Sequence, residues 1–293
     1  MTRFLAIVTV AATAAVAIAH PVAKIRVSPG SAPCAAAAGG RWVWVADYGL
    51  PQLLRVDPRT NKVRSVSTIG SGSCGLAYGA GSMWIEDTSS STVSRVSVRT
   101  GKRLAAVAVG STPYDATFAF GSAWTSAHLG GEVDRIDPAH DKVVARVKVN
   151  GPSGLVAAFG SVWAAGFDSV VRIDPATNKV VATLAGISGG WTAASADAVW
   201  ITTADSKLVR IDPATNRVAA TIALPALAGD PDVIGGKVWV PIIAKNDAVV
   251  VDPATNAIVQ TVETGKGPFV VTAIHGQAWI PSWKGSDIWR IAP

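Results

Sequence analysis

The stretch VVRIDPATNKVVAT, residues 170–183, contains the pattern from which the rest of the chain is built. Both ends are short runs rich in β-branched residues, which favour strands, and the centre, Asp174 to Asn178, has the composition of a turn. An Asp at the first turn position can accept a hydrogen bond from the backbone two residues on, and an Asn at the fifth position tolerates a positive φ. The stretch therefore predicts a β-hairpin.

The same pattern recurs along the whole chain with a period of about 40 residues. One tryptophan marks each copy, at Trp44, Trp84, Trp124, Trp163, Trp200, Trp239 and Trp279. The fifth turn position is occupied by Asn61, Gly101, Asp141, Asn178, Asn216 and Asn256, all residue types that tolerate φ > 0. Each period holds four strand-like runs, and the innermost is rich in small residues. The repeats predict an all-β fold, a seven-bladed β-propeller of four-stranded antiparallel blades.

The two ends of the chain predict how the ring closes. The seventh copy ends at Pro293, before its fourth strand, and Ala23–Val27 has the composition of the missing strand. We expect this N-terminal strand to complete the last blade, which leaves no unpaired edge between blades. Residues 20–293 are therefore expected to form a single propeller domain and a monomer.

Residues 1–19 differ from the repeats. Arg3 precedes an apolar run that ends in Ala17-Ile18-Ala19, the pattern of a secretory signal peptide cleaved before His20. An uncleaved membrane anchor is the alternative. We expect a secreted or periplasmic protein of the cell envelope, with no stable membrane insertion after cleavage.

The two cysteines occupy equivalent places in adjacent copies. Cys34 and Cys74 each lie ten residues before the tryptophan of their repeat. Neighbouring innermost strands can bring two Cα atoms to the separation that a disulfide requires, and export permits oxidation. We expect a Cys34–Cys74 disulfide, with two unpaired thiols as the alternative.

The net charge of +6 has a periodic origin. An Arg stands two residues before most of the turns, and the two positions share one face of a strand. This spacing predicts a repeated Arg–Asp pair, since most of these arginines have an Asp two residues on. The chain has no run of Lys or Arg, so we expect no nucleic-acid binding. The periodic residues are Arg55, Arg95, Arg135, Arg172, Arg210 and Arg290.

Candidate functional residues are those that occur in one copy only, on the loops that surround one end of the central channel. Aromatic side chains with a few polar groups suit a ligand pocket, and a channel plugged by these aromatics is the alternative. The ligand-binding candidates are Asp47, Tyr48, Tyr114, Asp115, Phe167, Asp168, Trp191, Asp230, Asp232, Lys245, Phe269, Trp283 and Lys284.

Catalytic and metal-binding signals are few. His128 is the candidate general base, without a recognisable partner. We expect no metal site and no cofactor. The alternative is a divalent cation held by acids that follow the second strands, namely Asp47, Asp87, Asp168, Asp205 and Asp247.

The repeat VWVA followed by VxRIDPATNKVVATI resembles the bacterial YVTN-type seven-bladed propellers, in the wider virginiamycin B lyase-like superfamily, over residues 22–293. The resemblance implies either an exported binding or surface protein, or a lyase that uses paired His and Glu residues with Mg²⁺. No His-x-Glu or Glu-x-His pair occurs in the chain. We therefore expect a non-catalytic propeller that binds a protein partner or a small ligand at the channel mouth. A divalent-metal-dependent lyase or hydrolase is the alternative.

Overall fold

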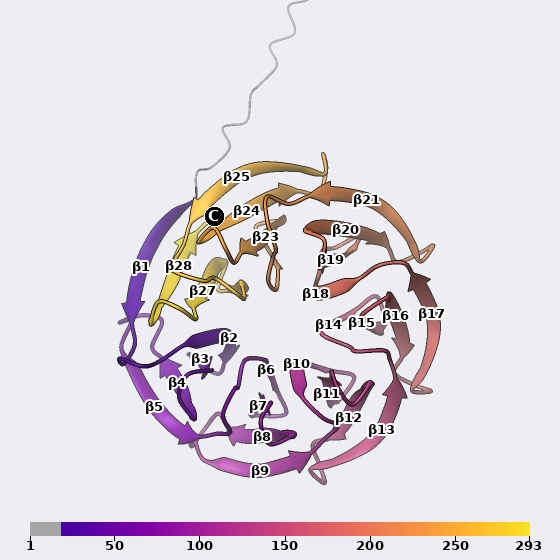
Figure 1. The fold of residues 1–293 in the computed structure, drawn as a ribbon. Coiled ribbons are helices and arrows are strands. Elements are labelled where there is room, and N and C mark those ends of the chain that lie inside the picture. Colours follow the sequence, from indigo (N-terminus) through magenta and orange to yellow (C-terminus); the bar gives the residue numbers. More distant parts are fainter. Residues whose placement is uncertain (1–18) are drawn as a thin grey trace, which may run out of the picture.

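The computed structural model describes residues 19–293, in which seven four-stranded antiparallel sheets surround a central axis as the blades of a propeller (Figure 1). The predicted fold class is confirmed. The predicted signal peptide falls almost entirely on residues outside this range. Within it, no helix is long and apolar enough to cross a membrane.

The strands follow one another from the channel outward in every blade. Blade 1 is β2 (Pro33–Gly39), β3 (Trp42–Asp47), β4 (Gln52–Val56) and β5 (Val63–Thr68). Blade 2 is β6 (Leu76–Gly79), β7 (Ser82–Asp87), β8 (Thr92–Ser97) and β9 (Arg103–Ala108). Blade 3 is β10 (Pro113–Ala119), β11 (Ser122–Ala127), β12 (Glu132–Asp137) and β13 (Lys142–Lys148). Blade 4 is β14 (Leu155–Ala158), β15 (Ser161–Ala165), β16 (Ser169–Asp174) and β17 (Lys179–Ala185).

The remaining blades repeat this order. Blade 5 is β18 (Gly189–Ala194), β19 (Val199–Thr203), β20 (Lys207–Asp212) and β21 (Arg217–Ala223). Blade 6 is β22 (Asp232–Ile234), β23 (Lys237–Ile242), β24 (Asp247–Asp252) and β25 (Ala257–Glu263). Blade 7 is β26 (Thr272–Ile274), β27 (Gln277–Ser282), β28 (Asp287–Ala292) and the N-terminal β1 (His20–Arg26).

The strand β1 closes the ring as predicted. It pairs antiparallel with β28, with Ile25 opposite Ile288 and His20 opposite Ala292, so the two ends of the described chain lie side by side (Figure 1). Ile25 is 3 % exposed and packs with Trp279 in the core between blades 7 and 1. The closing strand is therefore part of the hydrophobic core as well as of the sheet.

The turn between the third and fourth strands forms as its residues dictate. In blade 4, Asp174 Oδ1 accepts a hydrogen bond from the amide of Ala176 at 2.9 Å, and Asn178 has φ 56°. The same left-handed position recurs in the other predicted copies, including Gly101 with φ 73°. These turns lie at the face of the propeller opposite the loops that carry the candidate site.

The periodic tryptophans form the centres of the cores between blades. Each of the seven is at most 1 % exposed. Trp124, for example, packs against Val162 and Ile173 of the next blade. In blade 3 the indole nitrogen of Trp124 donates to the carbonyl of Ala119 at 3.2 Å, so the buried polar atom is satisfied.

The predicted pairing of Arg with the Asp two residues on is wrong. In blades 2, 3, 4, 5 and 7 the guanidinium instead crosses to the turn of the next blade. Arg135 donates from Nη1 to the Pro175 carbonyl at 2.6 Å and to Asn178 Oδ1 at 2.9 Å. Its Cζ lies 5.0 Å from the ring centroid of Trp124. The turn Asp is unavailable because its carboxylate already accepts hydrogen bonds from its own turn, as Asp137 does from Ala139 and His140.

Candidate binding site at the channel mouth

The central channel is lined by side chains from the innermost strands of all seven blades and holds a cavity of about 360 Å³. Small residues such as Ala35 and Ala193 leave this space open, because larger side chains on converging strands would fill it. Three carboxylates line it, those of Asp115, Asp230 and Asp232, and no Lys, Arg or His among residues 19–293 does so. A protein of net charge +6 therefore encloses a channel whose ionisable groups are acidic.

Aromatic side chains surround the channel mouth. Tyr48, Tyr114, Trp191, Phe269 and Trp283 line a second cavity of about 290 Å³, which shares Cys74, Tyr114, Trp191 and Phe269 with the channel cavity. Their rings touch in sequence, with centroid separations of 5.7 Å for Tyr48–Trp283, 6.1 Å for Trp283–Phe269, 5.0 Å for Phe269–Trp191 and 6.4 Å for Trp191–Tyr114. Five of the predicted candidates thus come together from blades 1, 3, 5 and 7 and the segment that joins blades 6 and 7.

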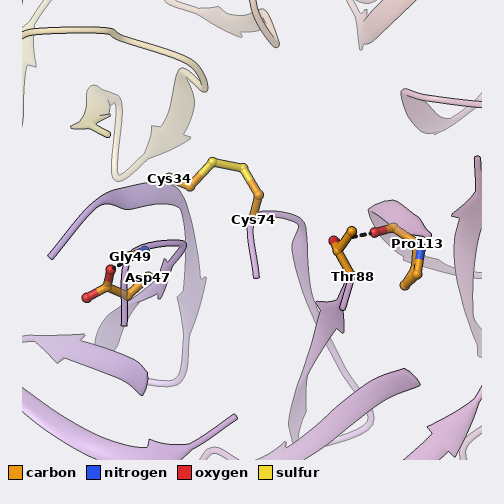
Figure 2. Close-up of a disulfide and its surroundings, with 6 residues drawn as sticks. All are labelled: Cys34, Asp47, Gly49, Cys74, Thr88 and Pro113. Atoms are coloured by element: carbon orange, nitrogen blue, oxygen red, sulfur yellow. Dashed lines mark hydrogen bonds between the residues drawn. A yellow bond between two sulfur atoms is a disulfide. The ribbon is translucent and has the colours of Figure 1, made fainter. Parts of the chain in front are cut away.

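The predicted disulfide is confirmed and forms part of the mouth. Cys34 on β2 is bonded to Cys74, just before β6, with the two Cα atoms 5.0 Å apart (Figure 2). Both cysteines line the mouth cavity, together with Thr88. Thr88 Oγ1 donates to the carbonyl of Pro113 at 2.8 Å (Figure 2). These two links join blade 1 to blade 2 and blade 2 to blade 3 at the rim, and so limit the movement of the cavity wall.

The backbone holds the Asp115 carboxylate in the channel wall. Oδ1 accepts from the amide of Ala116 at 2.8 Å, and Oδ2 accepts from the amide of Leu155 in the next blade at 2.7 Å. Burial disfavours the charged carboxylate and raises the pKa of Asp115 to about 7, although both amide hydrogen bonds act in the opposite direction. Asp115 therefore titrates near neutral pH.

Two more acids, Asp230 and Glu86, are buried close enough to Asp115 for its charge to affect them. Burial raises the pKa of Asp230 well above its usual value, and the charges of Asp115 and Asp232 raise it further. Asp230 Oδ1 is buried without a hydrogen-bond partner among the described residues. Burial also raises the pKa of Glu86, and the charge of Asp115 adds to that effect. Blades 3 and 6 face each other across the channel (Figure 1), so Asp115 and Asp230 repel each other through it.

The candidate base His128 lies in the aromatic wall. Its ring stacks on Tyr114 with centroids 4.5 Å apart and meets the edge of Phe167 at 4.8 Å. Nδ1 lies 3.2 Å from the carbonyl oxygen of Pro152 and 3.3 Å from Ser153 Oγ. The polar contacts of His128 are thus a carbonyl and a hydroxyl group. No carboxylate of the described chain contacts the imidazole ring.

Other predicted candidates do not line the mouth cavity. Asp47 is fully buried, and its oxygens accept hydrogen bonds from Ser31 and from the amide of Ala32. It also accepts from the amide of Gly49 (Figure 2). Asp168 accepts from Asn150 at 3.2 Å on the exposed rim. Lys245 and Lys284 line a separate cavity beside blades 6 and 7, and Lys284 Nζ lies 5.6 Å from the ring centroid of Trp283, one of the aromatic rings of the mouth. Among residues 19–293 no group of three His, Cys, Asp or Glu side chains is close enough to hold a metal ion.

Two contributors to the site were not among the predicted candidates. Thr88 gives no sequence signal, because a single Thr in a polar loop is common. Glu86 carries one: it is a rare Glu at the end of a second strand, directly before Asp87. Its burial could not be foreseen, because it depends on Gly75, where a Cβ atom would lie 2.4 Å from Glu86 Oε2.

Comparison with solved structures confirms the fold. A streptogramin B lyase structure superposes with a TM-score of 0.80 at 14% identity, covering 92% of this chain and 96% of that one. The WD40 β-propeller domain of Doa1 gives 0.80 at 11% identity, covering 94% and 97%. Hydrazine synthase of Kuenenia stuttgartiensis gives 0.77 at 16% identity, covering 91% and 97%. No protein-family model and no curated protein sequence matches the chain. The solved neighbours include enzymes and a WD40 domain, so the shared fold is compatible with either catalysis or binding.

Proposed function

We propose that this protein is a non-catalytic binding protein that holds a small organic cation at the mouth of its channel. One observation carries the proposal: five contacting aromatic side chains wall a cavity that opens onto three channel carboxylates. Aromatic faces attract cations through their quadrupole, with about 0.5–2 kcal/mol per contact, most for Trp. The wall and the acids therefore favour the same kind of ligand.

The dimensions support a small ligand. The mouth cavity of about 290 Å³ adjoins the channel cavity of about 360 Å³, and ligand pockets are typically of this order. The Cys34–Cys74 disulfide and the Thr88–Pro113 hydrogen bond hold the rim of the cavity in place. The cavity wall therefore loses little conformational freedom when a ligand binds. A cationic group on the aromatic wall would have the carboxylates of Asp115 and Asp230 beneath it.

Charge selectivity gives the sharpest test. Choline and its neutral isostere 3,3-dimethylbutan-1-ol have the same shape and differ in charge. At pH 8 we expect choline to raise the melting temperature of the protein and the isostere to have no effect, because ligands that bind the native state stabilise it. Tetramethylammonium and benzyltrimethylammonium extend the same test to smaller and larger cations.

Matched variants locate the effect. Trp191→Leu removes a ring from the mouth, and Tyr78→Leu removes a ring that is 45% exposed and lines neither cavity. We expect the cation-induced shift to be lost in the first variant and kept in the second. An equal shift with the neutral isostere, a shift that survives Trp191→Leu, or no shift with any of the three cations contradicts the proposal.

A further inference from the structure

An arginine bridge joins five of the seven pairs of neighbouring blades. Blade 6 has Val250 at the bridge position, whereas blade 1 has an arginine there, Arg55, that does not bridge to blade 2. In blade 3, Arg135 donates from Nε to Ser122 Oγ of its own blade at 2.9 Å, and from Nη1 to the Pro175 carbonyl and Asn178 of the next turn. The equivalent arginines Arg95, Arg172, Arg210 and Arg290 make the same contacts to the proline carbonyl of the following turn. Arg55 of blade 1 occupies this position but makes none of these contacts.

Two differences between the repeats leave Arg55 without the side-chain acceptors that the other arginines use. The place of Ser122 is taken in blade 1 by Trp42, and the place of Asn178 is taken in blade 2 by Gly101. Both side-chain acceptors of the bridge are therefore missing. Arg55 Nε is buried without a hydrogen-bond partner in the described chain, and its Cζ lies 4.3 Å from the ring centroid of Trp42.

Two further arginines converge on the same tryptophan region, and both are peculiar to blade 1. Arg41 lies with its Cζ 4.5 Å from the Trp42 centroid, at a position that is Gly81 in blade 2 and Gly121 in blade 3. Arg64, on the fourth strand, corresponds to Leu104 in blade 2 and to Val or Ala in blades 3 to 6. Together with Lys62 they line a cavity of about 230 Å³ around Arg55 and Trp42.

The charges of this cavity are unbalanced. Four cationic side chains line it with a single carboxylate, that of Asp57, whose Oδ1 accepts from the amide of Arg59. None of the four cations forms an ion pair within residues 19–293. Burial lowers the pKa of Arg55, and the charges of Arg64 and Arg41 lower it further. Such an array is unfavourable by itself and becomes favourable when an anion enters it.

We propose that Arg41 and Arg55, which stack on Trp42, form with Arg64 a binding site for a multiply charged oxyanion of the phosphate type. Planar guanidinium groups bind phosphate oxygens through paired charge-assisted hydrogen bonds, and stacking on an aromatic ring orients them. The site lies beside the turn between the third and fourth strands, at the face opposite the channel mouth. It is therefore independent of the cation site.

Inorganic pyrophosphate tests the site by isothermal titration calorimetry with the full chain. The variant Arg41→Gly/Arg64→Leu places the residues of blade 2 into blade 1, so it keeps the fold that the other repeats use. We expect it to weaken pyrophosphate binding by about 100-fold, about tenfold for each guanidinium. Arg217→Leu and Lys179→Leu, combined, remove the same charge from the outer strands of blades 5 and 4 and serve as the control.

The source of the phosphate group is settled by a second probe. Vesicles of phosphatidylcholine with and without phosphatidic acid, assayed by co-sedimentation, distinguish a lipid phosphate from a free one. Binding to either phosphate source that is lost in the blade 1 variant and kept in the control supports the site. Binding of neither probe by the wild-type protein, or equal binding by both variants, overturns it.

Discussion

At the scale of single residues, the channel acids govern how the protein responds to pH. A carboxyl group whose folded-state pKa is raised binds its proton more tightly in the folded chain, so its contribution to stability is largest at low pH and falls as pH rises toward the folded pKa. Asp230 belongs to this class because burial and neighbouring acids raise its pKa.

Asp230→Asn is therefore expected to stabilise the protein at alkaline pH. The amide keeps the shape of the side chain and removes the buried charge. We expect the free energy of unfolding at pH 8 to rise by about 1–3 kcal/mol, with a smaller change at pH 5, because lower pH favours the protonated acid. Urea melts at both pH values measure the difference. A variant that is less stable than the wild type at pH 8 contradicts this assignment.

The affinity for an organic cation is expected to follow the ionisation of Asp115. The pKa of Asp115 is raised to about 7, chiefly by burial, and the ionised form attracts a cation more strongly. Affinity for choline should therefore rise between pH 6 and pH 8. In Asp115→Asn this rise should be much smaller. Titration calorimetry at three pH values gives the profile, and a pH-independent wild-type affinity would be inconsistent with it.

At the scale of elements, the arginine bridges account for how neighbouring blades are joined. Arg135 donates to four acceptors across and within its blade, whereas Arg55 stacks on Trp42 without a hydrogen bond at Nε. The same residue type at the same repeat position is thus structural in one blade and unpaired in another.

Arg135→Ala and Arg55→Ala are expected to differ in stability. Removing Arg135 leaves the Pro175 carbonyl and Asn178 without their donor, which should lower the free energy of unfolding by about 1–3 kcal/mol. Removing Arg55 leaves no acceptor unpaired and relieves repulsion with Arg41 and Arg64, so the change should lie within about 0.5 kcal/mol. Chemical denaturation of both variants provides the comparison. Equal losses would show that the bridge contributes nothing specific.

Much of each element could be predicted because its determinants are local. The hairpin turn follows from Asp174, Pro175 and Asn178, which lie within five residues of one another. The arginine bridge could not be predicted in the same way, because Arg135 and its acceptor Asn178 are 43 residues apart and belong to different blades. The cysteine pair was predictable despite its separation of 40 residues, because that separation equals the repeat.

At the scale of the whole molecule, the ring depends on the strand that the N-terminal segment supplies. Without β1, the edge of β28 would be unpaired and the core that contains Ile25 and Trp279 would be open to water. The repeat count predicted this closure. The three acids that line the channel, Asp115, Asp230 and Asp232, were among the candidates named from the sequence. The hydrogen bonds that hold Asp115 could not be predicted, because they depend on a bulge that shifts the register of its strand between Pro113 and Ala116.

Two substitutions on β1 compare the contribution of a core side chain to stability with that of an exposed side chain on the same strand. Ile25→Asp places a carboxylate in the core between blades 7 and 1 and should lower the free energy of unfolding by about 3 kcal/mol or more. Val22→Asp adds the same group at a side chain that is 46% exposed, and should change it by about 0.5 kcal/mol or less. Thermal melts that place both variants at the wild-type midpoint would refute the closure by β1.

A crystal structure of the protein grown with choline at pH 8 decides whether the channel mouth binds an organic cation. We expect the trimethylammonium group in the mouth cavity, within about 6 Å of the ring centroid of Trp191 and on the channel side of Phe269, above Asp115 and Asp230. Choline bound at another surface, or an occupied channel mouth in which the cation turns away from the aromatic wall, would contradict it.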